Sequence, residues 1–279
     1  MKCYNKSILL IACMLIFLLI GAVSANKNNT ISNVSIGDNV LEIGSVNQTN
    51  GLVSSQNGVV DQFNNLTGLN SSLEVNTPSK SFDDLQNVID NSSDNSVLDL
   101  DCNYTYGGNG DFSGITINKN NFTIDGHGHT IDAKSATNSH VRIFNVTGTN
   151  ILLKNLHLIN ADVTGHGGAI QNTGTNVTIN NSVFINNKAS SVGGAINNNG
   201  VGFTVSNSTF TNNKASYGGA IGNDGDNFAV CNSIFNGNTA SMKGGAINTN
   251  HAINVSIKNS SFINNTANSF GGAIHNDDH

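Results

Sequence analysis

The sequence of 279 residues has no tryptophan, one proline and a single arginine, Arg142, and only 11% of its residues are charged. Aromatic side chains are also scarce, at 6% of the total. A chain so poor in charge and aromatic bulk cannot easily fill the large irregular core of a typical globular enzyme. It can still build a repetitive core, in which small β-branched side chains stack on copies of themselves.

Basic clusters are absent too, because no group of lysines or arginines occurs after Lys6 and the formal net charge is −6. Nucleic-acid binding requires a basic face, so we expect no nucleic-acid partner. The mild acidity indicates solubility rather than a choice of partner. Four cysteines occur, of which Cys3 and Cys13 fall in the N-terminal segment. Cys102 and Cys231 each stand alone, so we expect two isolated buried thiols rather than a disulfide.

The N-terminus is typical of a secretory signal peptide covering residues 1–25. Lys2 and Lys6 precede an apolar run at 8–20, and small residues at 23–25 offer a cleavage site. The run is short for a spanning helix, which needs about 20 residues, although an uncleaved anchor is the alternative. No second hydrophobic segment follows, so we expect a secreted or cell-surface protein without a membrane span in the mature chain. Sixteen Asn-x-Ser/Thr sites are candidates for glycosylation.

An internal repeat is the strongest signal in the sequence. Gly-Gly-Ala-Ile occurs five times, starting at Gly167, Gly193, Gly218, Gly244 and Gly271, and the successive starting positions are almost evenly spaced. A second word of the type Phe-x-x-Asn recurs with the same spacing, starting at Phe184, Phe210, Phe235 and Phe262. Each unit contains three short alternating apolar and polar runs separated by Asn and Gly, which is the pattern of strands.

Three short strands per unit of about 26 residues predict one coil of a right-handed, single-stranded parallel β-helix, an all-β solenoid. Equivalent residues then lie above one another and form columns. The columns predicted to be buried are Leu153/Ile179/Val205/Val230/Ile257, Leu158/Phe184/Phe210/Phe235/Phe262 and Phe144/Ile170/Ile196/Ile221/Ile247/Ile274. A fourth column is Asn155/Asn181/Asn207/Asn232/Asn259, which we interpret as a ladder of left-handed turns rather than a binding site. The Gly pairs are expected where φ is positive or where a Cβ would clash.

The ends of the solenoid can also be placed from the pattern. Residues 80–112 are predicted to form an N-terminal cap of a short helix and a first strand at 96–100. The helix begins after Ser81 and presents Phe82, Leu85, Val88 and Ile89 on one face. Residues 26–79 are rich in Asn, Ser, Thr and Gly and predict a flexible linker. The β-helix is assigned to 113–279. We expect its last coil to be incomplete and uncapped, with an open edge that favours self-association.

These repeats resemble those of chlamydial polymorphic membrane proteins, on the strength of Gly-Gly-Ala-Ile followed by Phe-x-x-Asn. The wider layout resembles adhesin-like proteins of methanogenic archaea, over about 81–279. It consists of a Phe-Asp-Asp-Leu-Gln helix, the segment 115–133 and Asn-rich coils. The resemblance implies a pectin-lyase-like β-helix, surface display, and attachment to other cells or to glycans.

Parallel β-helices of this type also include polysaccharide lyases and hydrolases, which need clustered or paired carboxylates. The best cluster in this sequence is Asp125, His127, His129 and Asp132, four potential metal ligands within eight residues. We prefer the alternative of a Gly-rich turn with outward polar side chains, and expect no catalytic residue, metal or cofactor. Arg142 replaces a Gly of the repeat and has no acidic column beside it.

The sequence therefore predicts a non-enzymatic, adhesin-like protein. Its flat face of Asn, Ser and Thr would bind glycans or proteins on the surface of another cell, weakly at each site and more strongly through many copies. Two alternatives stay open. One is a carbohydrate-active β-helix enzyme, intact or degenerate, and the other is a structural surface-coat protein.

Overall fold

The computed structural model describes residues 33–36, 39–42, 79–108, 110–134 and 140–277. The chain divides into two units, Met1–Leu73 and Glu74–His279. In the first, β1 (Asn33–Ile36) pairs antiparallel with β2 (Asn39–Glu42). Both strands fall within the predicted linker. The predicted signal peptide lies outside the described residues, as does the rest of that linker except Ser79, which begins β3.

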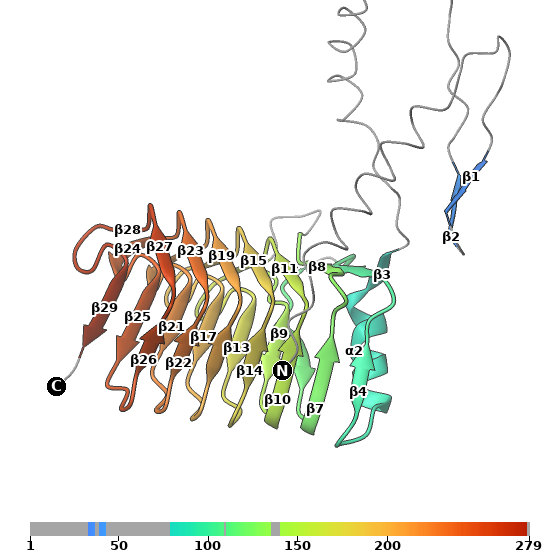
Figure 1. Cartoon of the computed structure of the whole chain (residues 1–279), viewed down its shortest axis with the longest axis horizontal. Coiled ribbons are helices and arrows are strands. Elements are labelled where there is room, and N and C mark those ends of the chain that lie inside the picture. The colour runs from blue at the N-terminus through green and yellow to red at the C-terminus, as the bar shows by residue number, and fades with distance from the viewer. Residues whose placement is uncertain (1–32, 37–38, 43–78, 109, 135–139, 278–279) are drawn as a thin grey trace, which may run out of the picture. The chain divides into compact units, whose positions relative to one another are not determined.

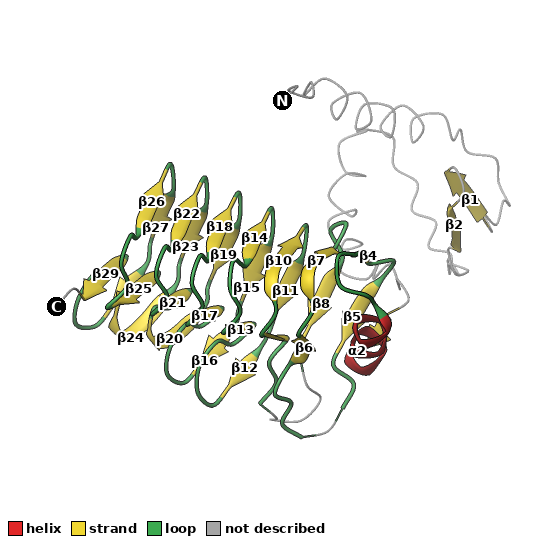
Figure 2. Ribbon diagram, turned by 90° about the horizontal axis from the view of Figure 1, so that it is seen from below, coloured by secondary structure: helices red, strands yellow, loops and turns green. Residues whose placement is uncertain are grey.

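The second unit is a parallel β-helix, in which four sheets run along the axis and each strand pairs with its counterpart in the next coil (Figures 1 and 2). Sheet I contains β4 (Val97–Asp99), β7 (Asn120–Asp125), β10 (Thr149–Lys154), β14 (Thr178–Asn180), β18 (Thr204–Ser206), β22 (Ala229–Cys231) and β26 (Ser256–Lys258). Sheet II contains β3 (Ser79–Ser81), β5 (Asn103–Thr105), β8 (Thr130–Asp132), β11 (His157–Ile159), β15 (Val183–Ile185), β19 (Thr209–Thr211), β23 (Ile234–Asn236) and β27 (Ser261–Ile263).

The other two sheets complete each coil. Sheet III contains β6 (Ile115–Ile117), β9 (Phe144–Val146), β13 (Ile170–Asn172), β17 (Ile196–Asn198), β21 (Ile221–Asn223), β25 (Ile247–Asn250) and β29 (Ile274–Asp277). Sheet IV contains β12 (Asp162–Val163), β16 (Lys188–Ala189), β20 (Lys214–Tyr217), β24 (Thr239–Lys243) and β28 (Thr266–Ala267). Three strands per coil therefore describe only the first two coils, because a short fourth strand joins each later one.

The predicted columns are confirmed in register, and their members are buried in every coil except the last, where Ile257 and Phe262 are half-buried and Ile274 is 38% exposed. Phe184 pairs with Phe210, which pairs with Phe235, and the aliphatic columns of sheets I and III keep the same register. Neighbouring phenylalanine rings in this column stack with centroids 4.6, 4.8 and 4.9 Å apart and planes 4° from parallel. Each buried side chain contributes roughly 1.5–3 kcal/mol relative to its exposed state. The core is therefore built by copying one cross-section along the axis.

Polar ladders lie inside this core and were not predicted. Asn213 is fully buried, donates from Nδ2 to the Phe184 carbonyl at 3.1 Å, and accepts from the Asn187 main-chain N–H at 3.0 Å. Asn187, Asn238 and Asn265 repeat this pattern in adjacent coils. A second ladder joins Asn172, Asn198 and Asn223. Buried main-chain groups must be paired, so these amides satisfy turns that no strand partner reaches.

The two glycines of each Gly-Gly pair have different roles. Gly193 has a φ of 66°, a left-handed conformation that favours glycine. Gly194 has an ordinary φ, but a Cβ there would overlap the carbonyl oxygen of Gly219 in the next coil. Both expectations for these pairs are confirmed, each at a different glycine.

The N-terminal end is covered by helix α2 (Phe82–Asn91), as predicted (Figure 1). Ser81 caps it, and the Asp84 carboxylate accepts from the Ser81 N–H at 2.9 Å while the Asp84 N–H donates to Ser81 Oγ at 3.1 Å. Gln86 pairs through both amide atoms with the main chain of Thr116 on β6. The helix therefore closes the edge of sheet III. The prediction for Val88 is wrong, because it is 39% exposed, whereas Phe82, Leu85 and Ile89 are buried.

Three further expectations can be compared with the structure. Cys102 is buried and Cys231 only half-buried, and both are free thiols, so the prediction of two buried thiols is half right. The coils begin before residue 113, since β4 and β5 already pair with β7 and β8. The last coil was expected to be incomplete, but, counted from β4, the seventh coil contains a strand of each sheet and ends with β29. Among the described residues, no helix has the length and apolar character to cross a membrane.

Candidate functional site

The corner between sheets I and II is longest in one coil. From β10 to β11 the chain turns through two residues, Asn155 and Leu156. From β7 to β8 it needs four, because the sequence Gly-His-Gly-His occupies residues 126–129. His127 adopts a φ of 47° and Gly128 a φ of 85°, so the extra residues form a left-handed loop that projects from the regular corner.

Asp125, the last residue of β7, anchors this loop. Its side chain lies against three donors: Lys154 Nζ at 2.6 Å, Asn155 Nδ2 at 2.7 Å and the His127 main-chain N–H at 3.0 Å. Burial alone would raise the pKa of Asp125, which is only 6% exposed, but these hydrogen bonds outweigh burial and lower its pKa to about 2. The carboxylate is therefore ionised and fully engaged at neutral pH.

His127 completes a small cluster with two aspartates. Its Nε2 lies 3.0 Å from Asp99 Oδ1, and its Nδ1 lies 3.8 Å from Asp125 Oδ1. One ligand atom from each of the three lies within 4.8 Å of the others, so the set could hold a metal ion. A metal ion there would have to displace Lys154, because the Lys154 ammonium already pairs with the Asp125 carboxylate.

Of the four predicted ligands, the structure brings together Asp125 and His127 but not His129 or Asp132. Asp132 ends β8, the next strand along the coil, where it accepts from Asn160 Nδ2 at 2.9 Å and from the Lys134 N–H at 2.9 Å. The third member, Asp99, was missed. It lies one coil before Asp125 and pairs with it in the register of β4 and β7.

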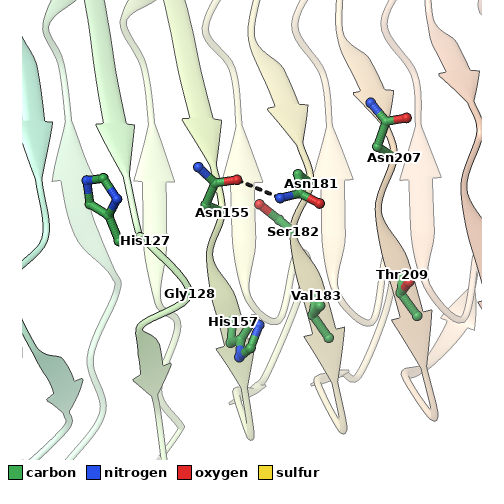
Figure 3. Close-up of a pocket in the computed structure, with 9 residues that line it drawn as sticks. All are labelled: His127, Gly128, Asn155, His157, Asn181, Ser182, Val183, Asn207 and Thr209. Carbon is green, nitrogen blue, oxygen red and sulfur yellow. Dashed lines mark hydrogen bonds between the residues drawn. The ribbon is translucent and has the colours of Figure 1, made fainter. Parts of the chain in front are cut away.

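A groove of about 390 Å³ runs from this loop across the next three coils, along the corners that follow β10, β14 and β18. Figure 3 shows the side chains of Asn155, Asn181 and Asn207 following one another across adjacent strands, with His127 at one end. A second row lies parallel to it and consists of His157, Val183 and Thr209, which are in register in sheet II. Ser182 lies between the rows.

The Asn row has the predicted left-handed turns. Asn155, Asn181 and Asn207 have φ values of 55°, 47° and 52°. Asn181 Nδ2 donates to Asn155 Oδ1 at 2.6 Å, so part of the row is an amide ladder. The ladder is thus structural, as expected, yet the same amides form one wall of the groove. Besides His127 and His157, the groove is lined by Asn, Ser, Thr, Val and Gly, and most of these side chains can donate and accept hydrogen bonds.

Comparisons with known proteins support the repeat and little else. Residues 207–224, 232–250 and 259–277 match the Chlamydia polymorphic membrane protein repeat, which confirms the resemblance noted in the sequence. No curated protein is a significant match. Among solved structures, the chain is similar to alginate lyase from Paenibacillus sp. str. FPU-7, at 13% identity over 71% of this chain and 98% of that chain. The TM-score is 0.28, which is too low to carry an argument about activity.

Proposed function

We propose that this protein is an adhesin-like surface protein that binds glycans or proteins of another cell through its groove, without catalysis. The observation that carries the proposal is the groove itself. It repeats neutral hydrogen-bonding side chains over successive coils, at the ~4.8 Å spacing of paired strands. Such a surface suits an extended ligand with many hydroxyl or amide groups. Binding would be weak at one groove and strengthened by many copies on a surface.

The matched repeats support this proposal, since the family model describes a membrane protein of Chlamydia. The signal peptide predicted at 1–25 agrees with export to the cell surface. Kinship with adhesin-like proteins of methanogenic archaea is part of the same proposal and rests on the sequence layout over 81–279. The proposed partners are glycans or proteins of other cells, with no nucleic acid.

The chemistry around Asp125 favours binding over catalysis. A glycoside hydrolase needs one carboxylic acid with a raised pKa as proton donor and a second carboxylate nearby. The pKa of Asp125 is shifted in the opposite direction, to about 2, and Lys154 holds the carboxylate as an ion pair. The competing enzyme hypothesis has a direct test: incubation with pectic and host glycans, followed by detection of reducing ends or unsaturated products. Turnover that Asp125→Asn or Asp132→Asn abolishes would replace the adhesin proposal.

The binding proposal is tested by the double variant His157→Val/Thr209→Val. It turns the row of His157, Val183 and Thr209 into three valines. The fold should tolerate the change, because Val183 already occupies the equivalent position between the two altered residues. We expect roughly tenfold weaker binding of protein-coated beads to target cells or glycan arrays, the effect of losing one to two hydrogen bonds.

The matched control is Thr178→Val/Thr204→Val, which removes the same kind of group from paired positions of β14 and β18 outside the groove. It should bind like the unchanged protein. Equal binding by the groove variant would place the contact surface elsewhere. No difference in cell binding between beads with and without the protein would favour the structural-coat alternative.

A further inference from the structure

The single arginine of the chain holds an unusual position in the solenoid. Arg142 stands where the repeat has the second glycine of Gly-Gly, and its half-buried side chain reaches over neighbouring coils. Its Nε donates to the Gly167 carbonyl at 3.0 Å, Nη1 to the Ser113 carbonyl at 2.8 Å and Nη2 to the His166 carbonyl at 2.8 Å. Three main-chain contacts fix the guanidinium in one orientation.

This guanidinium lacks a carboxylate partner among the residues that the structure describes, since no Asp or Glu there lies within 4.0 Å of it. Asp111 lines the same pocket as Arg142; its Oδ1 accepts from the His140 N–H at 2.8 Å, which leaves further acceptor capacity on the carboxylate. Asp162 pairs with Lys188 at 2.9 Å. A guanidinium has five N–H donors, and the three contacts use three of them. One donor on each Nη atom remains, which is the set that a planar carboxylate accepts from in a forked pair.

Arg142 lines a pocket of about 340 Å³, within the range of small-ligand sites. Asp111, Phe112, His140 and Thr164 also line it. The ring of Phe112 packs against Phe82 and Tyr106, with centroids 5.9 and 5.5 Å away, so its position is fixed by the cap. The pocket thus combines the guanidinium of Arg142, the carboxylate of Asp111 and the aromatic ring of Phe112.

We propose that this pocket binds an acidic sugar, with the sugar carboxylate on Arg142, its hydroxyls on Asp111 and an apolar ring face against Phe112. Asp111 discriminates within this class: it opposes a bare anion but accepts hydrogen bonds from hydroxyl groups. A uronate-type sugar presents both groups on one ring. The pocket lies outside the groove described above, and the inference rests on the proposed function only in taking the ligand to be a glycan.

The experiment measures binding of a hexuronate trisaccharide to the full chain by titration calorimetry, beside its methyl ester and a neutral hexose trisaccharide. We expect the methyl ester and the neutral sugar to bind at least tenfold more weakly, because each lacks the charge that Arg142 recognises. This comparison needs no variant, so it does not depend on the folding of a mutant. Inorganic sulfate and acetate should compete only weakly.

Three variants locate the site. Arg142→Lys keeps the charge but loses the planar fork, and should weaken the hexuronate at least tenfold. Thr164→Phe fills the pocket from an exposed position without touching the contacts of Arg142, and should have a similar effect. Lys214→Met, which removes one positive charge on β20, should leave binding unchanged. Circular dichroism of each variant verifies the fold.

The outcomes separate this inference from the proposed function. Equal affinity for hexuronate and its methyl ester, or an Arg142→Lys variant that binds hexuronate as before, overturns the acidic-sugar pocket. In either case the adhesin proposal survives if the beads still attach to cells and the groove variant weakens that attachment. If hexuronate binding depends on Arg142 but protein-coated beads do not attach to target cells, the pocket is supported and the adhesin proposal is refuted.

Discussion

The first coils and the later coils of the solenoid pair their strands in the same way but carry different side chains at equivalent positions. From β13 onward, the buried columns repeat one kind of side chain: Phe in sheet II, Ile in sheet III, and Ile or Val in sheet I. Buried ladders of Asn and Ser accompany them. The column that ends the strands of sheet I carries Asp99, Asp125 and Lys154 in the early coils and continues as Asn180, Ser206, Cys231 and Lys258. Arg142 of the early coils replaces a glycine. The charged residues of both candidate sites come from these early coils. The residues that repeat from coil to coil therefore specify the fold, and the residues that break the repeat provide the charged groups of the candidate sites.

This comparison predicts that the later coils are stabilised by packing that does not depend on charge. Phe210 is fully buried between Phe184 and Phe235. Phe210→Ala should lower the free energy of unfolding by about 3–5 kcal/mol, because it removes the transfer energy of a ring and leaves a cavity in a stack that cannot collapse along the axis. The measurement is urea unfolding followed by circular dichroism, repeated between pH 3 and pH 7.

The internal control is Phe262→Ala, at the last described position of the same column, where the ring is only half-buried. Its loss should be clearly smaller. Equal losses at Phe210 and Phe262, or a loss at Phe210 that varies strongly with pH, would contradict the view of a core held by uncharged stacking.

In the early coils we predict a pH-dependent contribution at Asp125. Its pKa is about 2 in the folded protein, below the ordinary value of 3.8 for an aspartate. A lowered pKa stabilises the fold above the unfolded value, so the contribution is present above about pH 4 and is lost as the pH falls toward 2. Asp125→Asn should therefore cost on the order of 2 kcal/mol at pH 7, and progressively less below pH 4.

The matched control for this titration is Asp224→Asn, an exposed aspartate of the later coils. It should change the free energy of unfolding by less than about 0.5 kcal/mol at any pH. Parallel stability curves for Asp125→Asn and the unchanged protein from pH 7 to pH 2 would show that Asp125 makes no charge-dependent contribution.

The difference between the two regions also explains what the sequence could predict. The Phe and Ile columns were predictable because the nearly constant length of the repeat aligns them directly. Asp125 and Lys154 are in register although they lie further apart in the chain than one regular repeat, since the loop at 126–129 adds residues to one coil, so their ion pair was not visible in the repeat. Asp99 was missed for a related reason, because it lies before the region that was assigned to coils.

Other omissions have a different physical cause. β16 has only two residues, Lys188 and Ala189, and is a strand by virtue of its pairing with β12 rather than its own pattern. Asn213 and its equivalents follow each buried Phe, and the repeat did contain them as the last Asn of the Phe-x-x-Asn word. An Asn beside a turn suggests solvent, however, and only the unpaired main-chain groups of the neighbouring coil explain why it points inward.

The smallest predicted effect concerns the helix that covers the first coil. Ser81 and Asp84 form a reciprocal cap at the N-terminus of α2, and Phe82, Leu85 and Ile89 bury that helix against the core. Ser81→Ala should cost about 1 kcal/mol, because one helical N–H loses its acceptor while the buried face stays intact. Hydrogen exchange should show the loss in α2 and in β6, whose Thr116 pairs with Gln86, and not in the later coils. If Ser81→Ala instead destabilised β19 and β23 as much as β6, the solenoid would unfold as one cooperative unit. The early and later coils would then differ in their side chains but not in their local free energy of unfolding.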